Sequence, residues 1–294
     1  IFDFMKKCNQ PIIIIGMHRS GTSMITRFIE DSGVFIGKKN KMGPNSEAFF
    51  FQKINEWLLY QKGASWDSTN NLNFNNKFTH DNLVKVVKNR LKSIIHTRNF
   101  LDFKNIFLNG NLLDCNFNWG WKDPKNTLLL DVWSEIFPNA KIIHIYRNPI
   151  DVANSLVQRE KRLENEFKIN WRVFKREFLL TKKPIYNQSV RITNIDEGIK
   201  LWEDYVNFSL NSEKYFKNVI HIGYENFLLN PKINLKKLSN FLGVIDDENV
   251  IESIISKVNP KRAYAFKTNY ELVKIYKNIK DRSLMKKLNY NNLL

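Results

Sequence analysis

The segment "PIIIIGMHRSGTS", residues 11–23, has the residue types and spacing of a loop that binds a phosphate-like anion. An isoleucine run, typical of a buried strand, leads into Gly16. Gly21 follows five residues later, and hydroxyl residues then open a helical pattern. Such a strand–loop–helix unit directs backbone N–H groups and a helix N-terminus at an anion. The sequence therefore predicts an anion-binding loop before residue 23.

The loop departs from the nucleoside-triphosphate pattern GxxxxGK[ST] at one position. Thr22 stands where that pattern has lysine, and the positive charge lies inside the loop at Arg19. A guanidinium is a planar, permanently charged fork that suits an oxyanion. No clear apolar run ending in Asp follows, because the later strand patterns end in "HIYR" and "HIGYE". We therefore expect a phosphate-type ligand, but not ordinary magnesium-dependent triphosphate hydrolysis.

A second pairing of a basic and a hydroxyl residue, Arg147 and Ser155, follows the strand pattern "KIIHIY". In an open α/β sheet, ligands collect at the carboxyl ends of the strands, so Arg147 is expected on the same edge as the first loop. Ser155 is placed about two turns into the next helix. The pair suits a second phosphate, although alone it would fit a surface arginine and an ordinary helix serine.

The elements that must position these residues alternate between strand and helix. This order predicts an α/β fold, a three-layer α/β/α arrangement with a central parallel sheet of the P-loop nucleotide-binding type. We expect one domain over residues 1–294, with helical excursions on the substrate side at about 40–110 and 156–200. Strands are expected at 11–16, in a short stretch from 120, at 141–147 and from 219, and helices at 22–32, 45–63, 81 to about 101, from about 125, from 149 and up to Gly243.

Composition limits the classes of protein and partner. With 43% hydrophobic residues the chain can bury a sizeable core, and a net charge of +17 favours anionic partners. No apolar run has the length of a membrane span. Cys8 and Cys115 lie far apart without metal-ligand spacing, which favours a reducing, cytoplasmic location. The alternative is the lumenal domain of a Golgi-type enzyme with a trimmed anchor.

"GMHRSGTS" followed by "AKIIHIYRNPIDVANS" resembles the sulfotransferases that use 3′-phosphoadenosine-5′-phosphosulfate (PAPS) and release 3′,5′-ADP. The resemblance implies that the first loop holds the 5′-phosphosulfate and that Arg147 with Ser155 holds the 3′-phosphate, without a metal ion. The loop residues that match the motif are Arg19, Ser20, Gly21, Thr22 and Ser23. His18 in the same loop could contact the ligand or make a structural hydrogen bond.

Two further segments extend the resemblance, which covers roughly residues 11–60 and 120–243. "WKDP" is similar to the protein-tyrosine sulfotransferase branch and implies that Lys122 helps catalysis. "GYENFLL" looks like the family segment whose tyrosine lies near the adenine, which implies that role for Tyr224. The "RKGxxGDWK" motif of the cytosolic small-molecule branch is absent, and Lys261–Arg262 is the candidate substitute for its phosphate contacts.

Sulfuryl transfer, by analogy with phosphoryl transfer, requires an oriented acceptor and neutralisation of the charge that grows on the leaving phosphate. We expect Arg19, the loop amides and Lys122 to neutralise that charge. The tyrosine branch has a glutamate base shortly after the first helix, which implies Glu47 here. A glutamate in a first helical turn can also simply favour the helix dipole. Asp67 and Glu56 are reserve candidates.

The function that these features favour is transfer of a sulfuryl group from PAPS to a hydroxyl or amine of a carbohydrate, peptide or small molecule. The acceptor is expected to be a glycan or a peptide. The alternatives are a nucleotide-dependent kinase or NTPase, and a basic module that binds polyanions. No nucleic-acid-binding motif supports the last. We further expect His144 to be a core histidine, Asp123 to shape the turn before Pro124, and the basic runs at 159–183 to form a solvated face.

Overall fold

The computed structural model describes residues 10–70, 72, 76–166, 189–244 and 248–294. The chain forms two compact units. The first contains Ile1–Asn148 and Asp204–Ala265, and the second contains Pro149–Glu203 and Phe266–Leu294. The expected single domain stays a prediction, and much of the expected excursion at 156–200, together with the basic run up to 183, lies outside the described residues.

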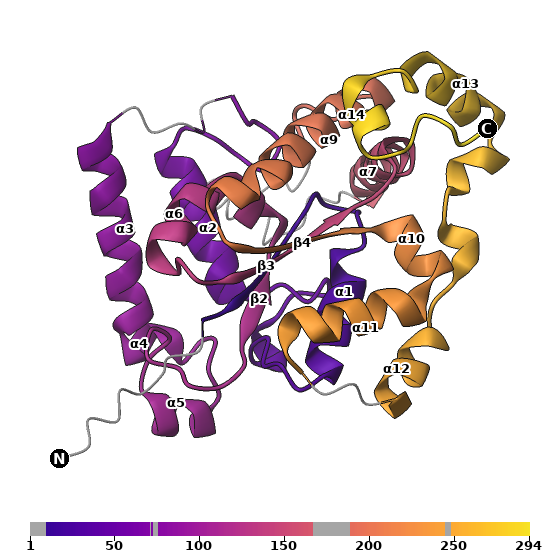
Figure 1. The fold of residues 1–294 in the computed structure, drawn as a ribbon. Helices are drawn as coiled ribbons and strands as arrows, with labels where there is room; N and C mark the ends of the chain where they lie inside the picture. Colours follow the sequence, from indigo (N-terminus) through magenta and orange to yellow (C-terminus); the bar gives the residue numbers. More distant parts are fainter. Residues whose placement is uncertain (1–9, 71, 73–75, 167–188, 245–247) are drawn as a thin grey trace. The chain divides into compact units, whose positions relative to one another are not determined.

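A parallel sheet in the first unit confirms the predicted α/β fold. Among the described residues it has four strands, which are β1 (Ile12–Ile15), β2 (Gly120–Lys122), β3 (Lys141–Tyr146) and β4 (Asn218–Gly223), in the order β2-β1-β3-β4 (Figure 1). β1 pairs in parallel with both β2 and β3. The strands run in one direction, so their carboxyl ends share an edge of the sheet. The residues at or just beyond these ends are Gly16, Lys122, Arg147 and Tyr224.

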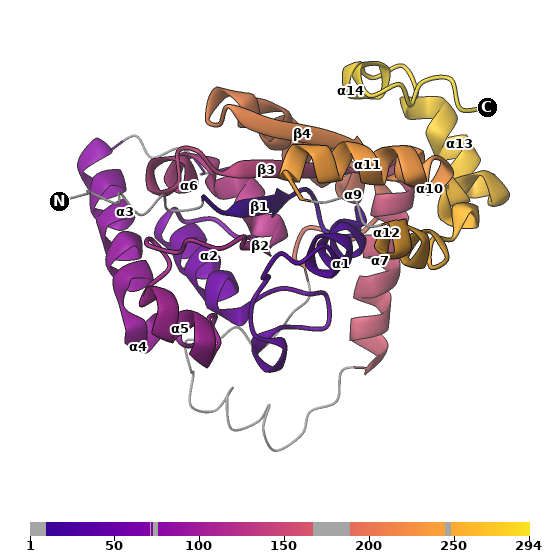
Figure 2. The same cartoon turned by 60° about the horizontal axis from the view of Figure 1, so that its bottom comes forward.

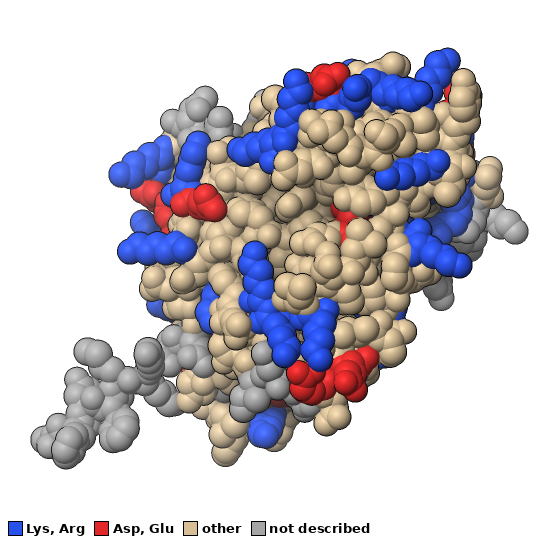
Figure 3. Space-filling model, turned by 45° about the vertical axis from the view of Figure 1, so that its right-hand side comes forward, with Lys and Arg blue, Asp and Glu red and all other residues tan. Residues whose placement is uncertain are grey.

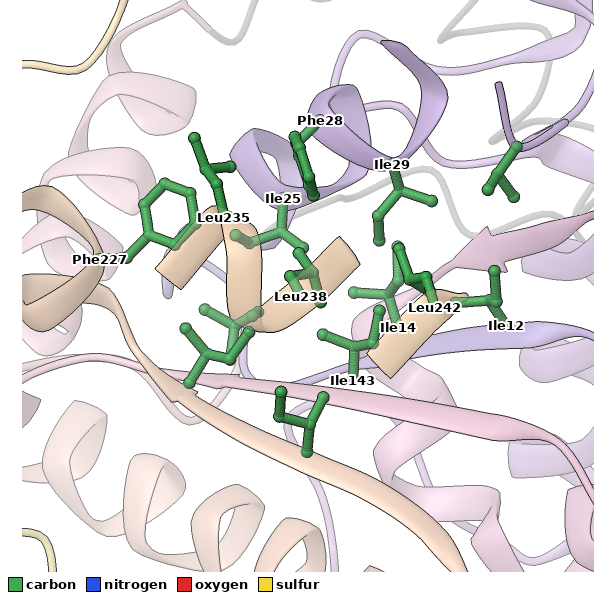
Figure 4. Close-up of a cluster of buried hydrophobic side chains, with 14 of the residues drawn as sticks. Ile12, Ile14, Ile25, Phe28, Ile29, Ile143, Phe227, Leu235, Leu238 and Leu242 are labelled. Carbon is green, nitrogen blue, oxygen red and sulfur yellow. The ribbon is translucent and has the colours of Figure 1, made fainter. Parts of the chain in front are cut away.

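Helices cover both faces of this sheet. α1 (Thr22–Asp31) and α11 (Pro231–Leu242) lie on one face, and α2 (Phe49–Gln61) and α6 (Leu130–Ile136) lie on the other (Figures 1 and 2). Figure 4 shows strand isoleucines directed at these helices on the first face, where Ile14 and Ile143 meet Ile25, Leu238 and their neighbours. The opposite face is aromatic: Phe51 stacks on Trp121 with ring centroids 4.0 Å apart. The predicted three-layer arrangement is present.

The start of α2 differs from the prediction. Residues 43–48 form a turn in which the Gly43 N–H donates to the Glu47 carbonyl oxygen at 2.8 Å. Ser46 has a φ of 60°, a left-handed conformation that a helix excludes. The prediction that Asn45 or Ser46 begins the helix is therefore wrong, and Glu47 precedes α2 instead of occupying its first turn.

The expected helix at 81–101 is divided. α3 (Lys77–Lys92) ends at Ser93, whose ψ of 114° is extended, and α4 (Ile94–Thr97) and α5 (Phe103–Asn109) follow. The helix predicted from about 125 starts as a 3-10 helix, η2 (Pro124–Leu129). Gly243, with a φ of 72°, ends α11 as predicted. The remaining elements of this unit are η1 (Lys39–Lys41), η3 (Asn211–Lys214), α10 (Tyr224–Leu229), α12 (Glu248–Ile255) and η4 (Pro260–Arg262).

The second unit is helical in its described residues. Its helices are α7 (Pro149–Glu166), the start of α9 (Ile195–Leu210), α13 (Tyr270–Ile279) and α14 (Ser283–Lys287). The 3-10 helix η5 (Ala265–Thr268) precedes α13. Asp151 in the first turn of α7 accepts a hydrogen bond from the Phe266 N–H at 2.9 Å. Near the C-terminus, the Tyr276 hydroxyl donates to the Tyr290 carbonyl oxygen at 3.0 Å and accepts from the Leu293 N–H at 2.9 Å. These bonds fasten the C-terminal segment onto α13.

Candidate functional site

The loop between β1 and α1 has an unusual backbone, with positive φ angles at three of its residues. Gly16 and Gly21 have φ values of 128° and 94°, and Arg19 between them has a φ of 70°. The Gly16 N–H donates to the Thr127 hydroxyl at 3.0 Å, and Gly21 is the N-cap residue of α1. The loop therefore wraps in front of the helix N-terminus, as the sequence predicted.

Gly16 approaches β3 so closely that it has no room for a side chain. A Cβ at this position would lie 2.2 Å from the Ile145 carbonyl oxygen. We expect Gly16→Ala to lower the free energy of unfolding by about 3 kcal/mol or more, measured by urea denaturation. Gly33→Ala is the matched control, because Gly33 also has a positive φ but open space around it, and it should lose only about 1–2 kcal/mol. Equal losses would contradict the close approach.

The Ser20 hydroxyl supplies a direct test of whether this loop fits an anion. Ser20 is 1% exposed, and its Oγ has no hydrogen-bond partner within the part of the chain that the structure describes. Leaving a buried hydroxyl unpaired costs roughly 1–3 kcal/mol. The neighbouring Thr22 is also buried and begins α1. A donor held unpaired in front of a helix N-terminus is suited to an oxyanion.

Arg147 lies beside the loop, as its position at the end of β3 predicted. Its guanidinium stacks over the Tyr224 ring at 4.7 Å from the centroid, and its Nη1 donates a long hydrogen bond, 3.4 Å, to the Arg19 carbonyl oxygen. Its Nη2 reaches the Arg262 carbonyl oxygen at 3.5 Å. The Tyr224 ring in turn fills the space where a Cβ on Gly21 would lie, only 2.3 Å away. Three segments that are distant in the sequence thus meet around the Arg147 guanidinium.

Ser155 is the predicted partner that belongs to the other unit. It lies half-buried on α7, in the second unit, whereas Arg147 belongs to the first. Its pairing with Arg147 therefore stays a prediction. Lys261 and Arg262 are exposed in η4. Arg262 is a neighbour of Arg147 through its carbonyl group, whereas a phosphate contact by its side chain stays a prediction.

Lys122 and Glu47 form an ion pair at the end of β2. The Lys122 Nζ lies 2.7 Å from Glu47 Oε1, and only 2% and 12% of the two side chains are exposed. Burial lowers the pKa of Lys122, and the charge of Glu47 opposes that shift in part. Gln52 Nε2 donates to the other Glu47 oxygen at 2.6 Å, a contact with no signal in the sequence. Both ends of the pair are thereby held in place.

Ser23 connects this ion pair to the loop. Its hydroxyl donates to the Asn45 carbonyl oxygen at 2.9 Å, so the turn that carries Glu47 is attached to the first turn of α1. The anion-binding loop, the arginine and the lysine–glutamate pair are thus assembled within one unit, on the edge of the sheet where the strands end.

Comparison with known proteins decides the family. The family model described as "Sulfotransferase family" matches residues 11–248. The chain belongs to the sulfotransferase family. Its members transfer sulfuryl groups, so this sulfotransferase is an enzyme of the EC 2.8.2 type. No match is found among curated proteins.

Similar solved structures are also sulfotransferases. The sulfotransferase from Alicyclobacillus acidocaldarius is 16% identical, with a TM-score of 0.44 over 81% of this chain and 83% of that one. The sulfotransferase domain of the Synechococcus PCC 7002 olefin synthase is 14% identical, with a TM-score of 0.47 over 92% and 94%. STF9 from Mycobacterium avium is 13% identical, with a TM-score of 0.43 over 93% and 76%.

A buried polar network supports the sheet edge of this sulfotransferase. Asp123 accepts hydrogen bonds from Asn55 Nδ2 at 2.9 Å and from the Lys125 N–H at 3.0 Å, and it caps η2 as expected of a turn-shaping residue. Asn126 accepts from the Trp121 indole at 3.0 Å and donates to the Ile14 carbonyl oxygen at 3.3 Å. The network joins β2 to β1 directly behind the loop and the ion pair.

The reserve carboxylates lie in different surroundings. The Glu56 side chain is 56% exposed, and its Oε1 accepts from Lys125 Nζ at 3.1 Å. Asp67 is buried and accepts from the Ser65 hydroxyl. Next to Asp67, the Trp66 ring contacts the His18 ring edge-on with centroids 4.9 Å apart, which gives His18 a structural contact that the sequence did not reveal.

Other features of the sulfotransferase lie away from this edge. His144 is buried, as expected, and its Nδ1 lies 2.8 Å from His221 Nδ1; burial and that neighbour lower the pKa of His144 well below its ordinary value. Within the described ranges, no group of three or more His, Cys, Asp or Glu side chains is arranged to hold a metal ion. No helix in those ranges is both long and apolar enough to cross a membrane.

Proposed function

We propose that this sulfotransferase uses PAPS as its donor and sulfates a hydroxyl or amine of a glycan or peptide. The observation that carries the donor proposal is the direct contact between the two predicted phosphate sites: Arg147 donates to the backbone of Arg19 inside the anion-binding loop. A nucleotide with phosphates on both sides of its ribose can contact both groups at once. A ligand with two phosphates explains why the Arg147 guanidinium lies next to a loop that already contains Arg19 and suits one anion.

The proposal assigns each predicted residue a place on the nucleotide. The loop holds the 5′-phosphosulfate, where the buried Ser20 hydroxyl and the α1 N-terminus offer donors. Arg147 holds the 3′-phosphate, with Ser155 and Lys261–Arg262 as further candidates. The Tyr224 ring stacks on Arg147 and lines the nucleotide side of the site. The loop contacts assigned by the proposal are His18, Arg19, Ser20, Gly21, Thr22 and Ser23.

When bound, PAPS supplies the sulfuryl group, and the residues of this chain supply charge and proton transfer. Arg19, the loop amides and Lys122 balance negative charge on the donor side. Glu47 accepts the proton of the acceptor group. Each Glu47 oxygen accepts one hydrogen bond, from Lys122 and from Gln52, and each keeps a free lone pair for that proton. The proposal includes no metal ion.

The acceptor class rests on charge and on the base. A carboxylate base suits a hydroxyl or amine, and a net charge of +17 favours an anionic glycan or an acidic peptide. On the surface drawn in Figure 3, Lys and Arg side chains lie in separate groups among uncharged residues. On this face the basic side chains of the described residues form no single continuous track of the kind that a polyanion-binding module would present.

Calorimetric titration with 3′,5′-ADP, 5′-AMP and ATP tests the donor proposal. Wild type is expected to bind 3′,5′-ADP without magnesium and far more tightly than 5′-AMP. Arg147→Ala should weaken 3′,5′-ADP binding about a hundredfold, close to the affinity for 5′-AMP, because the charged partner of the 3′-phosphate is lost. Arg27→Ala removes an exposed arginine on α1 and is expected to bind like wild type.

Tightest binding of ATP with magnesium, or equal binding of all three nucleotides, would overturn the proposal. The loop would then have to serve a kinase-like or general anion site. If the expected preference is found, labelled PAPS can be used to screen glycans, acidic peptides and small amines or alcohols for the acceptor.

A further inference from the structure

An apolar surface in the first unit has no role in the proposed reaction. The α4–α5 corner, defined as residues 94–108, carries five large apolar side chains that are more than half exposed. Both views place α4 and α5 side by side at this corner (Figures 1 and 2). The five are Ile94 (53%), Ile95 (67%), Phe103 (82%), Phe107 (82%) and Leu108 (55%). Phe103 and Phe107 are four residues apart and so lie on one face of α5.

The corner presents these side chains from a folded base. Phe100 and Leu101, between the two helices, are completely buried. The Asp102 side chain caps α5 by accepting from the Asn105 N–H at 2.8 Å. The Lys38 N–H donates to the Phe100 carbonyl oxygen at 3.1 Å, which ties the corner to the segment after α1. Phe103 and Phe107 are therefore exposed on a helix whose base is buried and hydrogen-bonded to the rest of the unit.

Exposed basic residues flank the apolar residues along the chain. Arg90, Lys92, Arg98 and Lys104 are exposed, and none of them forms an ion pair with a carboxylate of the described residues. Asp102 is the one acidic residue in the sequence from 90 to 108, so this segment has four basic residues against one acidic residue. From residue 94 to residue 108, exposed apolar residues and basic residues follow one another in turn along the chain.

We propose that the α4–α5 corner is a peripheral membrane contact that binds a bilayer containing anionic phospholipid. Phenylalanine and isoleucine side chains enter the boundary between headgroups and acyl chains, while lysine and arginine interact with anionic headgroups. Protein interfaces are enriched in arginine and phenylalanine as well as depleted in lysine, so composition alone does not separate a protein partner from a bilayer; the excess of four exposed cations over one acidic residue is what favours an anionic bilayer surface. Large exposed apolar side chains with a polar rim mark an interaction surface, and the unpaired cations specify its charge.

Co-sedimentation with vesicles tests this inference on the full chain. Wild type should bind vesicles of phosphatidylcholine mixed with phosphatidylglycerol and bind pure phosphatidylcholine much more weakly. Phe103→Asp/Phe107→Asp should lower binding to the mixed vesicles at least about tenfold. Phe78→Asp is the matched control, since Phe78 is 76% exposed at the start of α3, about 21 Å along that helix from its end next to the corner, and it should bind like wild type.

A second variant guards against the possibility that the phenylalanine substitutions lower vesicle binding by disturbing the fold. Lys92→Glu/Lys104→Glu changes only exposed charges and should also lower binding to the mixed vesicles more than about tenfold. The inference is overturned if wild type ignores the mixed vesicles, if it binds pure phosphatidylcholine equally, or if both variants bind like wild type. It is also overturned if ultracentrifugation shows that the Phe pair joins two copies of this chain while vesicle binding is unchanged. Nucleotide affinity plays no part, so the inference stands apart from the proposed donor.

Discussion

Glu47→Gln is expected to lower kcat for sulfotransfer by about 10²–10⁴-fold, because it removes the group proposed to take the acceptor proton. The amide keeps the size of the side chain and can still accept from Lys122, so 3′,5′-ADP affinity should stay within about twofold of wild type. Transfer from labelled PAPS to the acceptor found by screening gives kcat, and calorimetry gives the nucleotide affinity. A fall confined to kcat assigns Glu47 to the chemical step.

Two other carboxylates make this prediction specific. Glu56→Gln is the matched control, since Glu56 is a more exposed glutamate that is paired with Lys125, and it should have nearly wild-type kcat. Asp67→Asn tests the buried reserve candidate next to Trp66. Full activity of Glu47→Gln together with a large loss in Asp67→Asn would move the base to Asp67 and leave Glu47 as the structural partner of Lys122.

The parts of the fold that could be predicted are those in which local pattern and tertiary environment agree. A continuous isoleucine run forms a parallel strand because both faces of such a strand are covered. Glycines at 16 and 21 predicted the loop because their positive φ values suit few other residues. Arg147 was predicted beside the loop because parallel strands end at one edge.

The start of α2 was mispredicted because a distant contact overrides a good local signal. Asn45, Ser46 and Glu47 resemble a helix beginning, yet Ser46 adopts a left-handed turn. That turn places Glu47 against Lys122, 75 residues away along the chain. The alternative interpretation of Glu47, as a first-turn residue that favours the helix dipole, is therefore excluded, whereas its role as a base stays a proposal.

The partners of the predicted site residues came from segments without a local signature. Gln52, for example, reaches Glu47 from within α2. Trp66, which contacts His18, lies between α2 and α3 in a stretch for which the sequence predicted no contact. No periodicity or spacing connects such residues, since only the folded chain brings them together.

Lys122→Met is expected to lower kcat by about 10²–10³-fold and to destabilise the fold by roughly 3–5 kcal/mol. The second effect follows because Glu47 would remain buried without its partner. Urea denaturation measures the stability, and the double variant Glu47→Gln/Lys122→Met should recover part of it because no uncompensated charge remains. If the double variant loses the sum of the two single losses, the side chains act independently and the ion pair does not couple them.

The pH dependence of the unfolding free energy and of kcat distinguishes the effect of the Lys122 charge from the effect of its packing. Burial lowers the pKa of Lys122 below the ordinary lysine value of 10.5. Between those two pKa values the unfolded chain binds more protons, so the unfolding free energy of wild type should rise with pH relative to Lys122→Met. Over the same range kcat should fall as the ammonium loses its proton. In Lys122→Arg the guanidinium stays charged, so that alkaline fall should disappear. A fall that persists there would assign the titration to another group and reduce Lys122 to a structural partner of Glu47.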